Sequence, residues 1–387
     1  MQRGMTGFQV PVPSVGEPCK AFVPHPLPPE PPVRFDAELD ALREKASLSL
    51  GRLDGLAAVL PDASMFLYTY IRKEAVLSSQ IEGTQSSLSD LLLFENEATP
   101  GVPLNDVQEV SNYVAAMNYG LRRLPELPLS LRLLKEIHGE LLAKGRGASK
   151  EPGQFRRSQN WIGGTRPGNA TYVPPPPDHL NDCLGALEKF LHNQPVTTPA
   201  LIKAGLAHVQ FESIHPFLDG NGRLGRLLIT FILCAEGVLR DPLLYLSLYF
   251  KQHRQEYYDL LQQVRMKGDW EAWLKFFLKG VCETAEQSAK TAHALMRLAA
   301  KDEAKIQGIG RAAGSALRVH RYLQRQPITS IAKAADQLSL SVPAAAAALR
   351  NLEKLGIACE VTGGKYGRLY AYQEYLKLLE DKDAPLK

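Results

Sequence analysis

Between residues 35 and 305, apolar residues recur at the three-to-four-residue spacing of an amphipathic helix, with one long interruption. Prolines and glycines divide this pattern into segments, and each segment has an apolar face that must be buried. The spacing predicts a helix from Phe35 onward, followed by helices at about 64–81, 105–123, 130–142, 180–192, 199–213, 224–237, 251–266, 270–278 and a long one to about 305. We therefore expect an all-α fold for this region, formed as one helical body.

The interruption lies between Gly153 and Pro177, where a turn-rich sequence, Arg166-Pro167-Gly168-Asn169, stands between two short stretches. These stretches are Trp161, Ile162, Gly163 and Gly164 on one side and Thr171, Tyr172 and Val173 on the other. Short stretches flanking a Gly/Pro/Asn turn are typical of a β-hairpin, and the prolines at 174–177 end it. The sequence thus predicts a small hairpin attached to the helical body.

The composition is that of an ordinary globular protein, with 387 residues, a net charge of +4, 45% hydrophobic and 22% charged residues. This length suggests roughly two to three domains. The longest apolar run, residues 227–235, is well short of the ~20 residues that span a bilayer. Five distant cysteines without a CxxC pair argue against a disulfide framework or structural zinc. Prolines interrupt the N-terminus where a signal pattern would lie, so we expect a cytoplasmic protein with no membrane partner.

Residues 1–34 form an arm that is rich in proline. Because proline fixes φ and lacks a backbone donor, the arm is predicted to be extended or polyproline II. Phe22, Val23 and Leu27 lie between the prolines, which suggests that part of the arm packs against the body.

A boundary is predicted at Gly308-Ile309-Gly310, and residues 311–387 are predicted to form a winged helix-turn-helix domain. Its expected helices lie at 316–324, 331–338 and 341–354, and its wing pairs 357–361 with 369–372. The domain has twelve Lys and Arg against seven Asp and Glu, and Arg350, Lys365 and Arg368 could contact DNA phosphates. However, Ala344–Ala348 give the third helix few side chains that read bases, so DNA binding and protein binding both remain open.

The most informative stretch for chemistry runs from His215 to Arg226. Gly220, Asn221 and Gly222 permit a backbone that directs several N–H groups at one point, which is an anion-binding nest. The helix that follows adds its free N–H groups and the positive end of its dipole. Arg223 and Arg226 are three residues apart in the first turn and suit phosphate oxygens.

Two further side chains complete this stretch. Asp219 lies beside these positive groups and can hold a hard cation such as Mg²⁺ that also binds phosphates. His215 is the natural general base, because its ordinary pKa lies near ~6.5. The combination indicates a site for group transfer from a nucleotide phosphate.

These residues resemble, without departure, the signature of the Fic family, His-x-Phe-x-(Asp/Glu)-Gly-Asn-Gly-Arg-x-x-Arg. Residues 21–29 resemble the family's N-terminal extension, and the same plan continues to about residue 278. The resemblance implies a Fic helical core with a hairpin flap. It also implies the activity of typical members, protein adenylyltransferases (AMPylases), which move AMP from ATP to a Tyr, Thr or Ser hydroxyl and release pyrophosphate.

By this resemblance His215 would deprotonate the target hydroxyl, and Asp219 would hold Mg²⁺ between the α- and β-phosphates. Asn221, with the backbone of Gly220 and Gly222, would position the α-phosphate. Arg223 and Arg226 would bind the β- and γ-phosphates. The family's flap clamps an extended target segment by strand pairing, and residues 161–173 match it in place and character.

Residues 251–258 resemble the family's nucleotide-side helix, where Gln252 would reach ATP. For Tyr257 and Tyr258 in the same segment, core packing and adenine contact both remain open.

Glu82 lies at the C-terminal end of the helix predicted at 64–81, because Gly83 is a typical residue to end a helix. The negative end of the dipole is unfavourable for a carboxylate, which suggests a cationic partner, although exposed glutamates at helix ends are common. Ser78-x-x-x-Glu82-Gly83 matches the family's inhibitory pattern (Ser/Thr)-x-x-x-Glu-(Gly/Asn). The resemblance implies that Glu82 pairs with Arg226, so that the γ-phosphate cannot bind productively.

The domain division that follows is an N-terminal helical region at 35–125 with its inhibitory helix at 64–83, and a catalytic core at 126–306. Alternatives remain: another nucleotide donor, removal of AMP, or a DNA-associated regulator that uses the helical body as a nucleotide sensor or toxin-like effector. Self-modification and a homodimer are further expectations from the resemblance.

Overall fold

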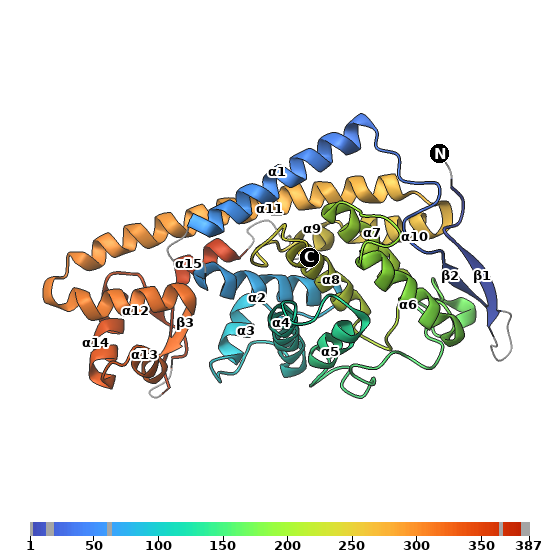
Figure 1. The fold of residues 1–387 in the computed structure, drawn as a ribbon. Coiled ribbons are helices and arrows are strands. Elements are labelled where there is room, and N and C mark those ends of the chain that lie inside the picture. Colours follow the sequence, from blue (N-terminus) through green and yellow to red (C-terminus); the bar gives the residue numbers. More distant parts are fainter. Residues whose placement is uncertain (1–2, 13–18, 60–63, 364–366, 381–387) are drawn as a thin grey trace.

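The computed structural model of the protein describes residues 3–12, 19–59, 64–363 and 367–380. Two long helices, α1 (Ala37–Val59) and α11 (Trp270–Gln307), lie side by side along one side of the molecule (Figure 1). The other helices of the body are α2 (Ser64–Ile81), α3 (Leu88–Phe94), α4 (Leu104–Arg123), α5 (Leu131–Leu141), α6 (Pro177–Leu191), α7 (Ala200–Ile214), α8 (Asn221–Ala235), α9 (Ser247–Gln252) and α10 (Arg254–Lys267). They share one hydrophobic core, which confirms the predicted all-α body.

The centre of the body is the pair α7 and α8, which pack against each other. Nearly every residue of α7 is buried, including polar ones, as expected for a helix surrounded by other helices. Only residues 215–220 separate the two helices. The end of α7 and the start of α8 are therefore held close together, and this is where the motif at 215–226 lies.

Two helix predictions were wrong in detail. The segment predicted as one helix at 251–266 is divided at His253, whose ring packs against Tyr249 at a centroid distance of 4.4 Å. Conversely, the two helices predicted from 270 to 305 form the single helix α11. Gly280 does not interrupt α11, because its missing side chain leaves room for the ring of Tyr249: a Cβ there would lie 2.6 Å from a ring carbon.

The N-terminal arm contains extended segments, one of the two predicted alternatives, but their pairing was not predicted. Strands β1 (Gly7–Val12) and β2 (Cys19–Pro24) form a two-stranded antiparallel sheet. Such a sheet has only edge strands, where proline is tolerated. Phe22 and Leu27 are buried, which confirms that part of the arm packs against the body, whereas Pro13 and Pro18 lie outside the described residues.

The C-terminal module contains η2 (Gly310–Ala312), α12 (Ala313–Arg325), β3 (Ile328–Ser330), α13 (Ile331–Gln337), α14 (Val342–Lys354), β4 (Cys359–Glu360), β5 (Leu369–Ala371) and α15 (Gln373–Leu379). The three predicted helices and the β4–β5 pair are present, and β3 adds a third strand in the order β3-β5-β4. This arrangement is consistent with the predicted winged helix-turn-helix. Arg350 and Arg368 are exposed, and Lys365 lies outside the described residues.

The module packs against the body through α12, which contacts α2, and α15, which contacts α11 (Figure 1). The Tyr372 hydroxyl donates to Asp302 Oδ2 of α11 at 2.8 Å. A second bond across this contact runs from Lys333 Nζ of α13 to Asn96 Oδ1 of the body, at 3.0 Å. Within the described part of the chain, no helix combines the length and apolar character needed to cross a membrane.

Candidate active site

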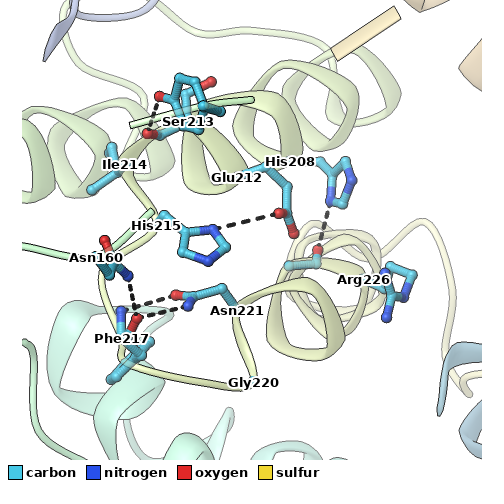
Figure 2. A network of polar contacts seen from close by, with 12 residues as sticks. Asn160, His208, Glu212, Ser213, Ile214, His215, Phe217, Gly220, Asn221 and Arg226 are labelled. Atoms are coloured by element: carbon cyan, nitrogen blue, oxygen red, sulfur yellow. Dashed lines mark hydrogen bonds and ion pairs between the residues drawn. The ribbon is translucent and has the colours of Figure 1, made fainter. Parts of the chain in front are cut away.

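His215 lies at the C-terminal end of α7 in a left-handed backbone conformation, with φ 49° and ψ 61°. Burial, followed by the charges of Arg265 and Arg156, lowers the pKa of its imidazole to about 3. Its Nδ1 lies 4.0 Å from Glu212 Oε2 and has no hydrogen-bond partner among the described residues (Figure 2). His215 is therefore neutral near pH 7 and able to accept a proton.

The loop after His215 is shaped by the side chain of Asn221, the first residue of α8. Its Oδ1 accepts from the Phe217 backbone N–H at 2.9 Å, and its Nδ2 donates to the Phe217 carbonyl at 2.8 Å (Figure 2). Asn160 Nδ2 donates to the same carbonyl at 3.0 Å. Gly220 closes the loop with φ 77°, a conformation that favours glycine. Both ends of the Asn221 amide are thus used to hold the loop.

The loop is also supported by His138, a histidine that was not among the residues predicted from the sequence. His138 of α5 stacks on the Phe217 ring at a centroid distance of 3.7 Å. The Gly153 backbone N–H donates to His138 Nδ1 at 2.9 Å, so the ring proton is on Nε2, which donates to the Asp219 carbonyl at 3.0 Å. Burial lowers the pKa of His138 to about 4, which keeps this arrangement neutral.

The first turn of α8 is covered by the carboxylate of Glu82. A Cβ placed on Gly222 would lie 2.3 Å from Glu82 Oε1 and 3.2 Å from Arg226 Nη1. The carboxylate therefore lies directly against Gly222 in the first turn of α8.

Arg226 joins this carboxylate to the inhibitory motif on α2. It donates from Nη2 to Glu82 Oε1 at 2.7 Å, from Nε to Ser78 Oγ at 2.8 Å, and from Nη2 to the Ser78 carbonyl at 3.0 Å. Burial would raise the pKa of Glu82, but the charge and hydrogen bond of Arg226 outweigh burial and lower it. The structure thus brings together the three residues that the sequence linked, Ser78, Glu82 and Arg226.

Arg223 and Asp219 lie on the other side of the same turn. Arg223 Nη1 forms a buried ion pair with Glu109 Oε1 of α4 at 2.9 Å, and Nη2 lies 3.4 Å from Asp219 Oδ1. Asp219 Oδ1 also accepts from the Gly220 N–H at 2.6 Å, and a third of the Asp219 side chain is exposed. The described residues contain no group of three His, Cys, Asp or Glu arranged to hold a metal. Glu109 was missed because it lies more than a hundred residues away from the motif.

The three residues considered for nucleotide contact, Gln252, Tyr257 and Tyr258, lie in different surroundings. Tyr257 is buried and its hydroxyl interacts with His208 Nε2 at 2.8 Å, so it belongs to the core. Tyr258 is 38% exposed, and partial burial followed by the negative charge of Glu82 raises the pKa of its hydroxyl. Gln252 is the last residue of α9 and is exposed, so its contact with ATP stays a prediction.

The predicted hairpin consists of one backbone pair, Ile162 with Tyr172, around the turn η1 (Pro167–Asn169). Its return arm is anchored: the Tyr172 hydroxyl donates to the Ser213 carbonyl at 2.5 Å, and the Val173 carbonyl accepts from the Phe22 N–H at 2.9 Å. The residues left exposed are Trp161, Gly163, Gly164 and Thr171. Of the seven predicted docking residues, Tyr172 and Val173 therefore serve mainly to attach the flap.

Comparison with protein families gives two adjoining matches. Residues 41–122 match the Fic/DOC family N-terminal region, and residues 128–233 match the Fic/DOC family itself. The second match contains the complete 215–226 motif, and the first contains Ser78 and Glu82. Residues 41–122 and 128–233 are thus similar to the two parts of the Fic/DOC family.

Two insect proteins are among the curated proteins to which this chain is similar. "Protein adenylyltransferase Fic" of Aedes aegypti is 34% identical over 201 residues, and its counterpart in Drosophila melanogaster is 29% identical over 200 residues. In both cases the match covers 51% of this chain and 37% of the relative. The chain thus matches little more than a third of the length of these proteins.

Solved structures confirm the Fic fold. A Fic family protein from Desulfovibrio desulfuricans G20 aligns over 88% of this chain and 97% of its own, with a TM-score of 0.57 and 20% sequence identity. A Fic domain-containing protein from Bacteroides thetaiotaomicron aligns over 67% of this chain and 98% of its own, with a TM-score of 0.50 and 18% identity. At this identity the likeness establishes the fold and leaves the reaction to be argued from the site.

Proposed function

We propose that this protein is a protein adenylyltransferase that moves AMP from ATP to a hydroxyl side chain of a target protein, and that Glu82 inhibits it. The observation that carries the proposal is the meeting of a neutral, partly buried His215 with the N-terminus of α8, where Gly222 and Arg226 lie against the carboxylate of Glu82. A site that holds a carboxylate against helix N–H groups and an arginine suits phosphate oxygens as well. The names of the insect relatives support the same reaction.

In this reaction His215 accepts the proton of the target hydroxyl as its oxygen attacks the α-phosphorus. A new P–O bond to the target forms, the bond between the α-phosphorus and the bridging oxygen breaks, and pyrophosphate leaves. A neutral imidazole is required for this step, and the imidazole is neutral near pH 7, although burial together with Arg265 and Arg156 also lowers its pKa and weakens it as a base. Gly220 and Gly222 allow the phosphate close to the helix N-terminus, because neither carries a Cβ.

The residues at this site also fit Mg²⁺. Asp219 offers one partly exposed carboxylate, and Mg²⁺ in nucleotide sites commonly takes one or two carboxylates together with phosphate oxygens and water. When bound, Mg²⁺ would neutralise charge on the phosphates. Arg223 is held by Glu109 so that it faces the same side of the turn as Asp219.

Inhibition by Glu82 follows from competition for space and charge. Its carboxylate lies against Gly222, which is proposed to help position the α-phosphate, and bonds to Arg226, which is proposed to bind the terminal phosphates. A nucleotide that binds beside this carboxylate meets a like charge and loses Arg226 as a partner. Its α-phosphate is then displaced from His215.

The test is incubation of wild type, Glu82→Gly and His215→Ala with labelled ATP and Mg²⁺, followed by intact mass measurement. We expect Glu82→Gly to gain at least one AMP by self-modification, and wild type and His215→Ala to gain none. If Glu82→Gly remains unmodified and also modifies no protein in a cell extract, adenylyl transfer is refuted. Equal modification of wild type and Glu82→Gly would refute the inhibition alone.

The nucleotide donor is tested in the same variant by competition with other nucleoside triphosphates and with CDP-choline. We propose ATP because the intact Arg226 suits a triphosphate. Stronger transfer from another donor would leave the roles of His215 and Glu82 in place but change the substrate.

A further inference from the structure

Arg156 is a buried arginine just before the flap, and it pairs with no carboxylate in the described part of the chain. It is 2% exposed, and burial lowers the pKa of its guanidinium to about 10. A buried, unpaired cation is costly unless its donors are satisfied. The hydrogen bonds of Arg156 all go to backbone carbonyls, and these carbonyls satisfy the buried guanidinium.

Two of these carbonyls belong to the end of α7. Arg156 Nε donates to the His215 carbonyl at 2.9 Å, and Nη2 lies 3.4 Å from the Ile214 carbonyl. The Arg156 backbone N–H also donates to the Pro216 carbonyl at 2.9 Å. A cation at a helix C-terminus is favoured by the dipole, and these bonds satisfy carbonyls that have no partner within the helix.

These contacts hold His215 where a non-glycine residue is rarely found. Its left-handed backbone, with φ 49°, is unfavourable for a residue with a Cβ and must be stabilised by its neighbours. The guanidinium bonds to the carbonyl of this same residue, so it acts directly on the conformation that directs the imidazole into the site.

The remaining two donors reach the two ends of the flap. Nη1 donates to the Ser158 carbonyl at 3.2 Å, and Nη2 donates to the Pro175 carbonyl at 2.5 Å. Ser158 precedes the flap strand at Ile162, and Pro175 follows the return strand at Tyr172. One planar group thus bonds to the backbone of His215 and to both ends of the flap.

We propose that Arg156 is a positioning residue that fixes the general base and the target-docking flap relative to each other. Its fork sets the distance between the hydroxyl presented by the flap and the imidazole that deprotonates it. The expected effect of Arg156 on AMP transfer rests on the function proposed above. Its expected effect on the geometry of His215 and the flap does not.

The test compares Arg156→Lys with Arg3→Lys, each made in the Glu82→Gly chain. Lysine keeps the charge but cannot make the forked set of bonds. Arg3 is a control outside the motif, since its side chain is 3% exposed and donates to the carbonyls of Pro31, Pro32 and Gly268, although it also pairs with the carboxylate of Glu271. Arg156→Gln, which keeps a donor without the charge, serves in place of Arg156→Lys if the latter does not fold.

We expect Arg156→Lys to lower the turnover of AMP transfer at least tenfold while the Kd for ATP changes less than twofold. Arg3→Lys should change both less than twofold, even with a similar drop in melting temperature. Transfer at the parent rate by Arg156→Lys, or an equal loss in Arg3→Lys, overturns the proposal.

A second measurement does not depend on activity. In NMR spectra of the full chain, Arg156→Lys should shift the His215 imidazole signal, assigned with His215→Ala, and the amide signals of Ile162 and Tyr172 together. Arg3→Lys should leave all three in place. If the parent transfers no AMP but these shifts appear, the proposed function fails and the positioning role stands; unchanged signals in Arg156→Lys overturn the role itself.

Discussion

The loop from His215 to Gly220 and the flap from Trp161 to Val173 lie against the same site but are built in opposite ways. In the loop, Asn221, Asn160 and His138 bond to the backbone of nearly consecutive residues, and the side chains that do so come from different elements. The flap has one strand pair and is attached mainly along its return arm. The proposed chemistry thus rests on a rigid, prearranged loop, whereas target docking rests on a segment with unpaired backbone edges.

The largest expected effect comes from breaking the loop with Asn221→Ala. This removes both hydrogen bonds to Phe217 and leaves its buried N–H unpaired, while its carbonyl keeps the bond from Asn160, so we expect a loss of about 2–3 kcal/mol in unfolding free energy. AMP transfer by the Glu82→Gly chain should fall at least a hundredfold. Asn160→Ala is the matched control, because it removes one bond to the same carbonyl, and about 1 kcal/mol is expected. Chemical denaturation and labelled-ATP transfer measure both; equal effects of the two variants would show that Asn221 does not organise the loop.

The next effect separates the inhibitory contact from the phosphate site. In Gly222→Ala the new methyl would lie 2.3 Å from Glu82 Oε1, so the carboxylate must move away. The same methyl would also meet the proposed phosphate, and we expect at least a tenfold weaker Kd for ATP by calorimetry. Glu82→Gly, in contrast, should bind ATP at least as tightly as wild type. Unchanged ATP binding by Gly222→Ala would place the phosphates away from the first turn of α8.

A smaller effect is the pH dependence of the Glu82–Arg226 contact. The pKa of Glu82 is lowered in the folded protein, so the contact stabilises the fold above the ordinary glutamate pKa of ~4.3 and is lost as pH falls through the lowered value. Because about a third of the Glu82 side chain is exposed, we expect a modest difference of about 1 kcal/mol between wild type and Glu82→Gln at pH 7. Denaturation at pH 7 and at about pH 3 measures this difference. A difference that persists at the lower pH would argue against an ion pair.

The smallest effect on stability is expected at the flap. Trp161 is 39% exposed, so Trp161→Ala should change the unfolding free energy by no more than about 0.5 kcal/mol and leave the Kd for ATP unchanged. The KM for a protein target should rise if this residue docks it. Tyr172→Phe provides the contrast, since the loss of its bond to the Ser213 carbonyl should cost about 1 kcal/mol. If Trp161→Ala loses as much stability as Tyr172→Phe, the flap is not held more loosely than the loop from His215 to Gly220.

Periodicity, a local signal, predicted most of the helices. The meeting of Ser78 and Glu82 with Arg226 spans 148 and 144 residues and was implied by the family resemblance. The sequence did not reveal His138, Arg156, Asn160 or Glu109, which reach the motif across 57 or more residues and carry no local pattern. The pairing of β1 with β2 was hidden by prolines that are tolerated only because both strands are edges. The division of α9 from α10 depends on how His253 packs on Tyr249, which no spacing rule contains.

The packing of the C-terminal module on α2 changes how a deletion would have to be interpreted. The helix that carries Ser78 leads from the site to α12, and the Tyr375 hydroxyl of α15 interacts with Thr69 on that helix. A chain cut at Gly308 would lose this support and expose one side of α2 to water. Any gain in AMP transfer after such a cut would therefore report a loosened inhibitory helix, and would say nothing about whether the missing module reads DNA.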